Sequence, residues 1–130
     1  MTVSMITAGL LGLILIALSL RISLIRRASH VSLGDGNNPI LAARIRAQAN
    51  FTEYVPTGLI LLFIAEQTAG AHWLVITIAA ALVLGRILHA IGMGLPAPNG
   101  PRILGIVLTW ASILLLALIC LVHGIERLLP

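Results

Sequence analysis

The sequence predicts an all-α integral membrane protein that folds as a four-helix bundle. Of its 130 residues, 59% are hydrophobic and 9% are charged, and the mean hydropathy is +1.10. A soluble domain of this size has no means of burying so much apolar surface. The apolar residues also gather into four segments near the roughly 20-residue length that crosses a bilayer as a helix. These predicted spans, all in one domain covering residues 1–130, are residues 3–25, 41–68, 72–93 and 103–123.

Composition excludes several classes of protein. Eight basic residues, all arginine, oppose four acidic residues, giving a formal net charge of +4. These charges are too sparse for a nucleic-acid partner, which needs a clustered basic face on a soluble surface. Cys120 is the one cysteine, so no intrachain disulfide forms. Residues 1–20 lack a basic leader and a cleavage site, so we interpret them as a retained span and not as a signal peptide.

The connections between spans carry helix-ending signals. Residues 32–39, SLGDGNNP, predict a loop in which Asn38 caps the second helix. Residues 69–72, AGAH, predict a tight hairpin with Gly70 ending the second helix. Residues 92–101, GMGLPAPNGP, predict a third loop whose last proline opens the fourth helix.

The arginines predict the orientation of the chain in the membrane. Most of them flank the first loop or end the third loop, and a single one lies at the opposite side. By the positive-inside rule, the first and third loops are cytoplasmic and both termini are non-cytoplasmic. We therefore expect a multi-pass protein of an inner or plasma membrane. The two groups of arginines are Arg21, Arg26, Arg27, Arg44, Arg46 and Arg102 on one side, and Arg127 on the other.

The second span begins with the polar motif RIRAQANFTEYVP. At about 100° per residue, Asn50, Glu53 and Tyr54 lie about +40°, −20° and +80° from Arg46. These four side chains therefore share one face, which enters the membrane from the cytoplasmic surface. Gln48 points elsewhere, toward a neighbouring helix or subunit.

The depth of Glu53 in this stripe requires a partner, because a charge within hydrocarbon costs roughly 2.5–3.5 kcal/mol. Arg86 lies at the same depth in the third span and is the expected partner, with His89 on nearly the same face of that helix. One interpretation is a structural ion pair, with Asn50 and Tyr54 hydrogen bonding between helices. We favour a ligand site, because the region holds more arginine than one glutamate needs. The excess predicts an anionic ligand.

Arg102 is a candidate catalytic residue. It lies in the first turn of the fourth helix, where free N–H groups and the positive end of the helix dipole favour an anion such as a thiolate. The alternative is an interfacial arginine that extends toward the lipid headgroups.

The remaining histidines do not predict a metal site. His72 and His123 fall on the far side of the membrane near Glu66 and Glu126, without the spacing of a ligand set. Interfacial anchoring accounts better for His72. We therefore expect no metal.

The polar motif at residues 44–56 resembles the signature of the MAPEG superfamily, membrane-associated proteins in eicosanoid and glutathione metabolism. "GRILH", residues 85–89, is similar to an element of the prostaglandin E synthase branch, and Arg102 falls where that branch has its catalytic arginine. The four-span layout agrees, so the resemblance covers nearly the whole chain. Its short loops are most similar to those of small bacterial members.

The resemblance implies a homotrimer that holds glutathione in the cytoplasmic leaflet between adjacent subunits. Arg102 would stabilise the glutathione thiolate, and a hydrophobic second substrate would enter from the lipid. The glutathione contacts implied by the resemblance are Arg46, Asn50, Glu53 and Tyr54, with Gln48 from the neighbouring subunit, Arg86 and His89 from the third helix, and Arg26 or Arg27 from the first.

The expected function is that of a glutathione-dependent transferase or peroxidase acting on lipophilic electrophiles. Two departures bear on it: Met93 stands where relatives often have tyrosine, and Ile103 where the prostaglandin synthase has serine. The alternative is a non-catalytic lipid- or glutathione-binding protein of the same fold. A small drug/proton exporter is disfavoured, because such transporters need an acid in the first span and residues 3–20 contain none.

Overall fold

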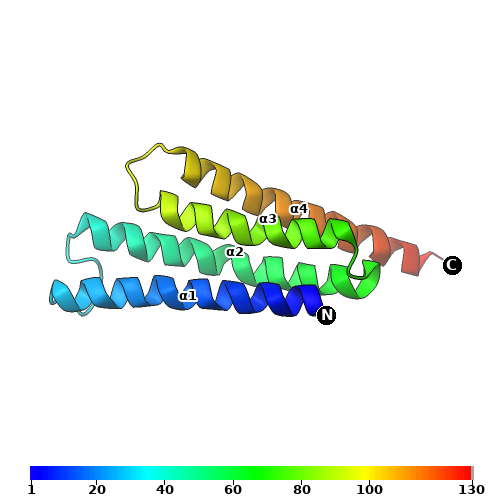
Figure 1. The fold of residues 1–130 in the computed structure, drawn as a ribbon, viewed down its shortest axis with the longest axis horizontal. Helices are drawn as coiled ribbons and strands as arrows, with labels where there is room; N and C mark the ends of the chain where they lie inside the picture. The colour runs from blue at the N-terminus through cyan, green and yellow to red at the C-terminus, as the bar shows by residue number, and fades with distance from the viewer. Residues whose placement is uncertain (130) are drawn as a thin grey trace.

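A computed structural model describes residues 1–129 and consists of four long helices in one up-and-down bundle (Figure 1). Residues 1–129 contain no strand, so the predicted all-α fold is confirmed. The helices overlap the four predicted spans, with differences of one to five residues at their ends. They are α1 (Thr2–Ala28), α2 (Pro39–Ala69), α3 (Trp73–Gly92) and α4 (Gly100–Leu128).

Local signals in the sequence fix where these helices begin and end. The side chain of Asn38 accepts hydrogen bonds from the backbone N–H groups of Ile40 and Leu41, and a proline follows it. At the other end of α2, Gly70 has φ of +76°, a left-handed conformation that a glycine adopts without strain. Both ends of α2 are therefore as predicted.

Three helices, α1, α3 and α4, are long and apolar enough to cross a membrane. The 31-residue α2 is not among them, because charged and amide side chains occupy its first half and recur near its end. α2 and α3 each pack against the other three helices, whereas α1 and α4 make no contact with each other. The most polar helix of the bundle thus packs against all three apolar helices.

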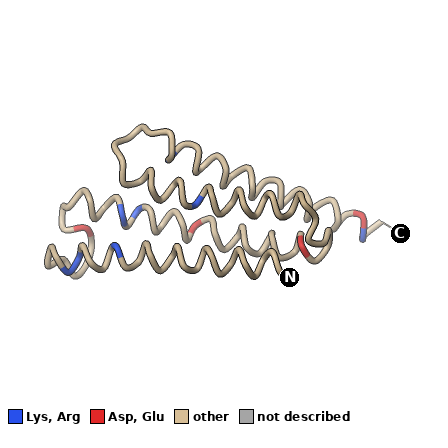
Figure 2. Tube along the Cα trace, in the orientation of Figure 1, with Lys and Arg blue, Asp and Glu red and all other residues tan. Residues whose placement is uncertain are grey.

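The outer surface and the core both suit a bilayer. Large apolar side chains are exposed along all four helices, as expected where lipid is the solvent. Inside, Phe51, Val55 and Leu82 pack with Leu11 and Leu18 as one of two apolar clusters. Arginines concentrate toward the end of the bundle that holds the first loop (Figure 2).

Glycines bring α3 and α4 into backbone contact. A methyl group added at Gly105 would lie 2.7 Å from the carbonyl oxygen of Gly85, and one added at Gly85 would lie 3.0 Å from the carbonyl oxygen of Gly105. Small residues permit this approach between membrane helices, where van der Waals contact provides much of the association energy. This pair makes the most extensive helix–helix contact of the bundle.

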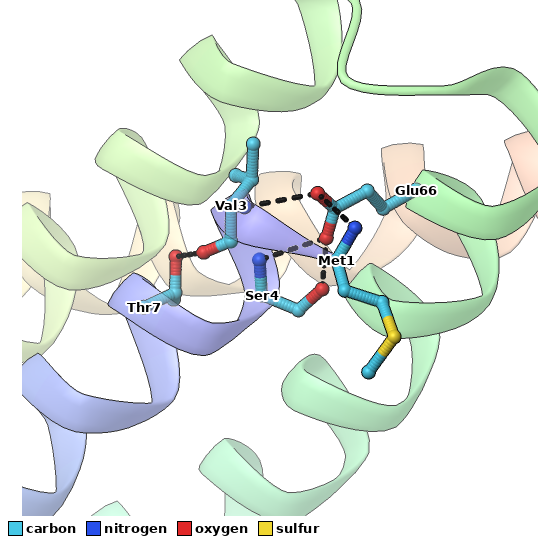
Figure 3. A network of polar contacts seen from close by, with 5 residues as sticks. All are labelled: Met1, Val3, Ser4, Thr7 and Glu66. Carbon is cyan, nitrogen blue, oxygen red and sulfur yellow. Dashed lines mark hydrogen bonds and ion pairs between the residues drawn. The ribbon is translucent and has the colours of Figure 1, made fainter.

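At the opposite end from the first loop, Glu66 of α2 holds the beginning of α1 (Figure 3). Its carboxylate accepts hydrogen bonds from the backbone N–H groups of Val3 and Ser4, each at 2.9 Å, and from the Ser4 hydroxyl. The amino group of Met1 lies 3.0 Å from one carboxylate oxygen. The side chain is buried, and the N-terminus of α1 compensates its charge.

Candidate functional site

A cavity of about 570 Å³ opens between α2, α3 and α4, beside the loop that joins α3 to α4. We call it the polar cavity. It brings together four of the side chains that the sequence singled out: Asn50, Tyr54, His89 and Arg102. The remainder of its wall is Ala97, Pro98, Asn99, Ile103, Ile106 and Trp110.

Three helices place the polar side chains of this cavity. Asn50 and Tyr54 are one turn apart on α2, and His89 is in the last turn of α3. Arg102 lies in the first turn of α4. Farther along α4, Trp110 contributes to an apolar wall. The cavity wall therefore has a polar part and an apolar part.

Arg86 lies behind the cavity wall and is completely buried, at 0% exposure. Its Nη2 donates a hydrogen bond to Oδ1 of Asn50 at 3.0 Å, and its Nη1 lies 3.4 Å from Oγ1 of Thr109. The guanidinium carbon is 5.5 Å from the ring centre of Phe51 and 6.0 Å from that of Tyr54. Among residues 1–129, its Nε has no hydrogen-bond partner.

The predicted Arg86–Glu53 ion pair is wrong. Glu53 instead pairs with Arg46, with 3.2 Å between Oε1 and Nη1, and their side chains are 46% and 63% exposed. Residues seven apart lie on the same side of a helix, and this side of α2 faces outward. Arg86 is thus bonded to neutral oxygens, and it forms no ion pair with a carboxylate of residues 1–129.

The other predicted contacts lie outside the polar cavity within one chain. Arg46 and Glu53 are on the outer side of α2. Gln48 reaches a neighbouring helix, as predicted, and its Nε2 lies 2.6 Å from Oγ of Ser19 on α1. Arg26 and Arg27 line a separate shallow hollow at the end of α1.

Comparison with known proteins identifies the family of this chain. The model of the MAPEG family matches residues 4–122. The chain belongs to the MAPEG family. It is 30% identical over 116 residues to the inner membrane protein YecN of Escherichia coli strain K12, covering 89% of this chain and 88% of that relative. The YecN protein of Escherichia coli O6:H1, strain CFT073, matches to the same extent.

The polar cavity of this MAPEG protein includes a residue that sequence reasoning missed. Asn99 caps α4: its Oδ1 accepts a hydrogen bond from the Arg102 N–H at 2.9 Å, and its Nδ2 donates to the carbonyl oxygen of Gly92 at 2.9 Å. An asparagine two residues before Pro101 is a typical helix-capping signal. That signal predicts the cap but not the bond to α3.

Two further features have weaker sequence signals. Arg102, Ile106 and Trp110 follow one another at intervals of about one helical turn, so the sequence places them on one face of α4. The sequence does not show that this face borders a cavity. The guanidinium of Arg44 packs on Gly94, where an added methyl group would lie 2.6 Å from Nη1. No local pattern pairs these two residues, which are 50 positions apart.

The charge of the polar cavity has one sign. Arg102 lines it and Arg86 lies behind Asn50, whereas the wall formed by residues 1–129 contains no carboxylate. Nδ1 of His89 is buried and has no hydrogen-bond partner among residues 1–129. A cationic cavity with an unpaired polar atom is suited to an anionic ligand with hydrogen-bonding groups.

Proposed function

We propose that this MAPEG protein is a membrane-bound glutathione-dependent transferase or peroxidase acting on lipophilic electrophiles. The observation that carries the proposal is the polar cavity, in which Arg102, His89, Asn50 and Tyr54 meet beside an apolar wall. Its polar part suits a charged tripeptide, and its apolar part suits a substrate that arrives through lipid.

The residues fit the chemistry of glutathione. The tripeptide has two carboxylates, which planar guanidinium groups bind with paired hydrogen bonds. Its free thiol has a pKa of about 8.5, so most of it is protonated at neutral pH. A guanidinium such as that of Arg102 lowers the pKa of the thiol, which loses its proton to water and becomes a nucleophile. His89, which lines the cavity, would hydrogen bond to an amide or a carboxylate of the tripeptide.

We propose a homotrimer to account for the predicted residues outside the cavity. Arg46 and Glu53 are exposed on α2 in the single chain, and they would complete the site where a second subunit adjoins it, with Glu53 binding the glutathione ammonium. Gln48 and Arg26 or Arg27 would come from that second subunit. Arg86 would act from behind Asn50, which it holds at 3.0 Å.

The proposed location is an inner membrane, with the first and third loops cytoplasmic. Two observations support it: the relatives are named inner membrane proteins, and arginines concentrate at the end with the first loop. The site would then receive glutathione from the cytoplasm. Its second substrate would enter from the bilayer.

The test is glutathione binding and turnover by the detergent-solubilised protein. We expect calorimetry to detect binding, and ultraviolet absorbance to detect the bound thiolate. Conjugation of a chlorinated dinitrobenzene, or reduction of a lipid hydroperoxide, should fall about 100-fold in Arg102→Ala. Arg127→Ala, at the far end of α4, is the matched control and should retain activity. Absence of binding at millimolar glutathione contradicts the proposal.

A second candidate function is glutathione or lipid binding without turnover. Ile103, next to Arg102 in the cavity wall, favours it because the position offers no hydroxyl to a thiolate. This candidate predicts binding of glutathione or a fatty acid with neither thiolate absorbance nor conjugation. The same titration therefore separates the two functions.

A further inference from the structure

The side chain of Asn99 joins the end of α3 to the beginning of α4. Its Nδ2 donates to the carbonyl oxygens of Gly92, at 2.9 Å, and Pro96, at 3.1 Å. Its Oδ1 accepts from the backbone N–H of Arg102 at 2.9 Å. One amide thus uses both ends to connect three backbone positions.

Gly92 contacts the backbone of Arg102 directly. A methyl group added to Gly92 would lie 2.6 Å from Cα of Arg102 and 2.7 Å from its Cβ, with the backbone nitrogen nearer still. Real side chains do not make such contacts with backbone atoms, so the first turn of α4 would have to move. The glycine allows Arg102 to sit against α3 without a gap.

We propose that Asn99 and Gly92 are positioning residues that set the place of Arg102 in the polar cavity. We call the two residues the Asn99 clamp. This inference rests on the proposed function, in which Arg102 lowers the pKa of a thiol. Neither residue is required to touch glutathione for the clamp to act.

The position of a guanidinium decides how strongly it acts on a thiolate, since Coulomb interactions weaken with distance. Arg102 lies in the first turn of α4, where helices fray and where backbone N–H groups lack helical partners. The Asn99 cap satisfies the N–H of Arg102 itself. The bonds to Gly92 and Pro96 then tie this turn to α3, which also carries His89.

Asn99→Ser separates positioning from helix capping. Serine is an equally good cap and can accept from the Arg102 N–H, but it cannot also reach two carbonyl oxygens. We expect the pH midpoint of thiolate absorbance to rise by about one unit, which is a tenfold loss of thiolate at low pH. The Kd for glutathione should change much less.

Asn38→Ser is the matched control for this substitution. Asn38 caps α2 in the same manner, and its Nδ2 also donates to the side chain of Ser29, the residue that follows α1. It lies outside the polar cavity. We expect the thiolate midpoint to stay at the wild-type value.

Gly92→Ala tests the second half of the clamp. The added methyl group would meet the backbone of Arg102, so we expect some loss of thermal stability, and the kinetics are measured well below the unfolding midpoint of the variant. At that temperature, displacement of Arg102 should lower kcat/KM for conjugation by about 100-fold, as misplacements near 1 Å do. Gly124→Ala, with open space around the added methyl group, is the control on α4 and should leave kcat/KM unchanged.

Amide hydrogen exchange tests the clamp without glutathione. The N–H groups of Gly94 and Leu95 donate to Ile91 and Gly92 in the loop that Asn99 ties down. Their exchange should be faster in Asn99→Ser than in wild type or Asn38→Ser. Unchanged exchange overturns the clamp.

The outcomes for the clamp and for the proposed function are distinct. If the wild-type protein neither binds glutathione nor forms a thiolate, the proposed function is wrong. In that case amide hydrogen exchange in Asn99→Ser is the measurement that tests the Asn99 clamp. A wild-type thiolate whose midpoint is the same in Asn99→Ser overturns the positioning role, even if exchange is faster.

Discussion

Glu66 and Arg86 are both buried charges in an apolar bundle, and they are bonded in different ways. Glu66, 4% exposed, accepts from two backbone N–H groups and a hydroxyl at the beginning of α1. Arg86, 0% exposed, has two neutral oxygens as partners, and its Nε has none among residues 1–129. The anion is compensated by hydrogen bonds and by the amino group of Met1. The cation has the rings of Phe51 and Tyr54 nearby but no ion-pair partner among residues 1–129, and it lies behind the polar cavity.

This difference separates a structural charge from a functional one. A fully bonded charge fixes how two helices meet and has no remaining capacity for a ligand. A charge with spare hydrogen-bonding capacity costs stability, and such residues in membrane proteins are commonly part of a site. The comparison predicts opposite phenotypes for the two residues.

Glu66→Ala should have the largest effect on stability. It leaves the N–H groups of Val3 and Ser4 without an acceptor in an apolar setting, which costs about 3 kcal/mol in total. We expect a lower midpoint of thermal unfolding in detergent, with glutathione binding retained at low temperature. Glu126→Ala, at the exposed end of α4, is the control. An unchanged midpoint would mean that Glu66 does not secure α1.

Arg86→Met should show the reverse pattern. Replacing a buried charge by an apolar side chain of similar length is often neutral or stabilising. The loss of positive charge and of the bond to Asn50 should weaken glutathione binding about tenfold, or about 1.4 kcal/mol by calorimetry. Unchanged affinity together with lower stability would make Arg86 a structural residue like Glu66, and the comparison would fail.

Glu53→Gln should have the smallest effect on stability. An exposed ion pair such as Arg46–Glu53 contributes less than about 0.5 kcal/mol. If a second subunit completes the site there, glutathione affinity should still fall by more than this value. Equal, small changes in stability and affinity would place Glu53 outside the site.

Local signals in the sequence predicted much of the fold. The apolar segments, the Asn38 cap and Gly70 each depend on neighbours within a few residues, and the helices end close to the expected positions. The cluster around Glu66 has no such signal. Its hydrogen bonds join residues that are separated by 62 and 63 positions in the sequence. Hydropathy alone indicates only that Glu66 is a charged residue near the end of a predicted span.

The candidate site was predicted in part, for a geometrical reason. Helical arithmetic gives the order of side chains around α2 but not the rotation of α2 against its neighbours. Asn50 and Tyr54, on one side of the predicted stripe, line the cavity, whereas Arg46 and Glu53, on the other side, face outward. A rotation of this face by a fraction of a turn therefore keeps Glu53 away from Arg86.

The glycine contact between α3 and α4 also affects how a bulky molecule reaches the polar cavity. Because Gly85 and Gly105 leave no space between these backbones, His89 and Arg102 are carried by one stiff hairpin. Widening of the cavity then depends on the contact between α2 and α4. The size of molecule that this protein admits, and how fast it enters, should follow the distance to which these two helices separate.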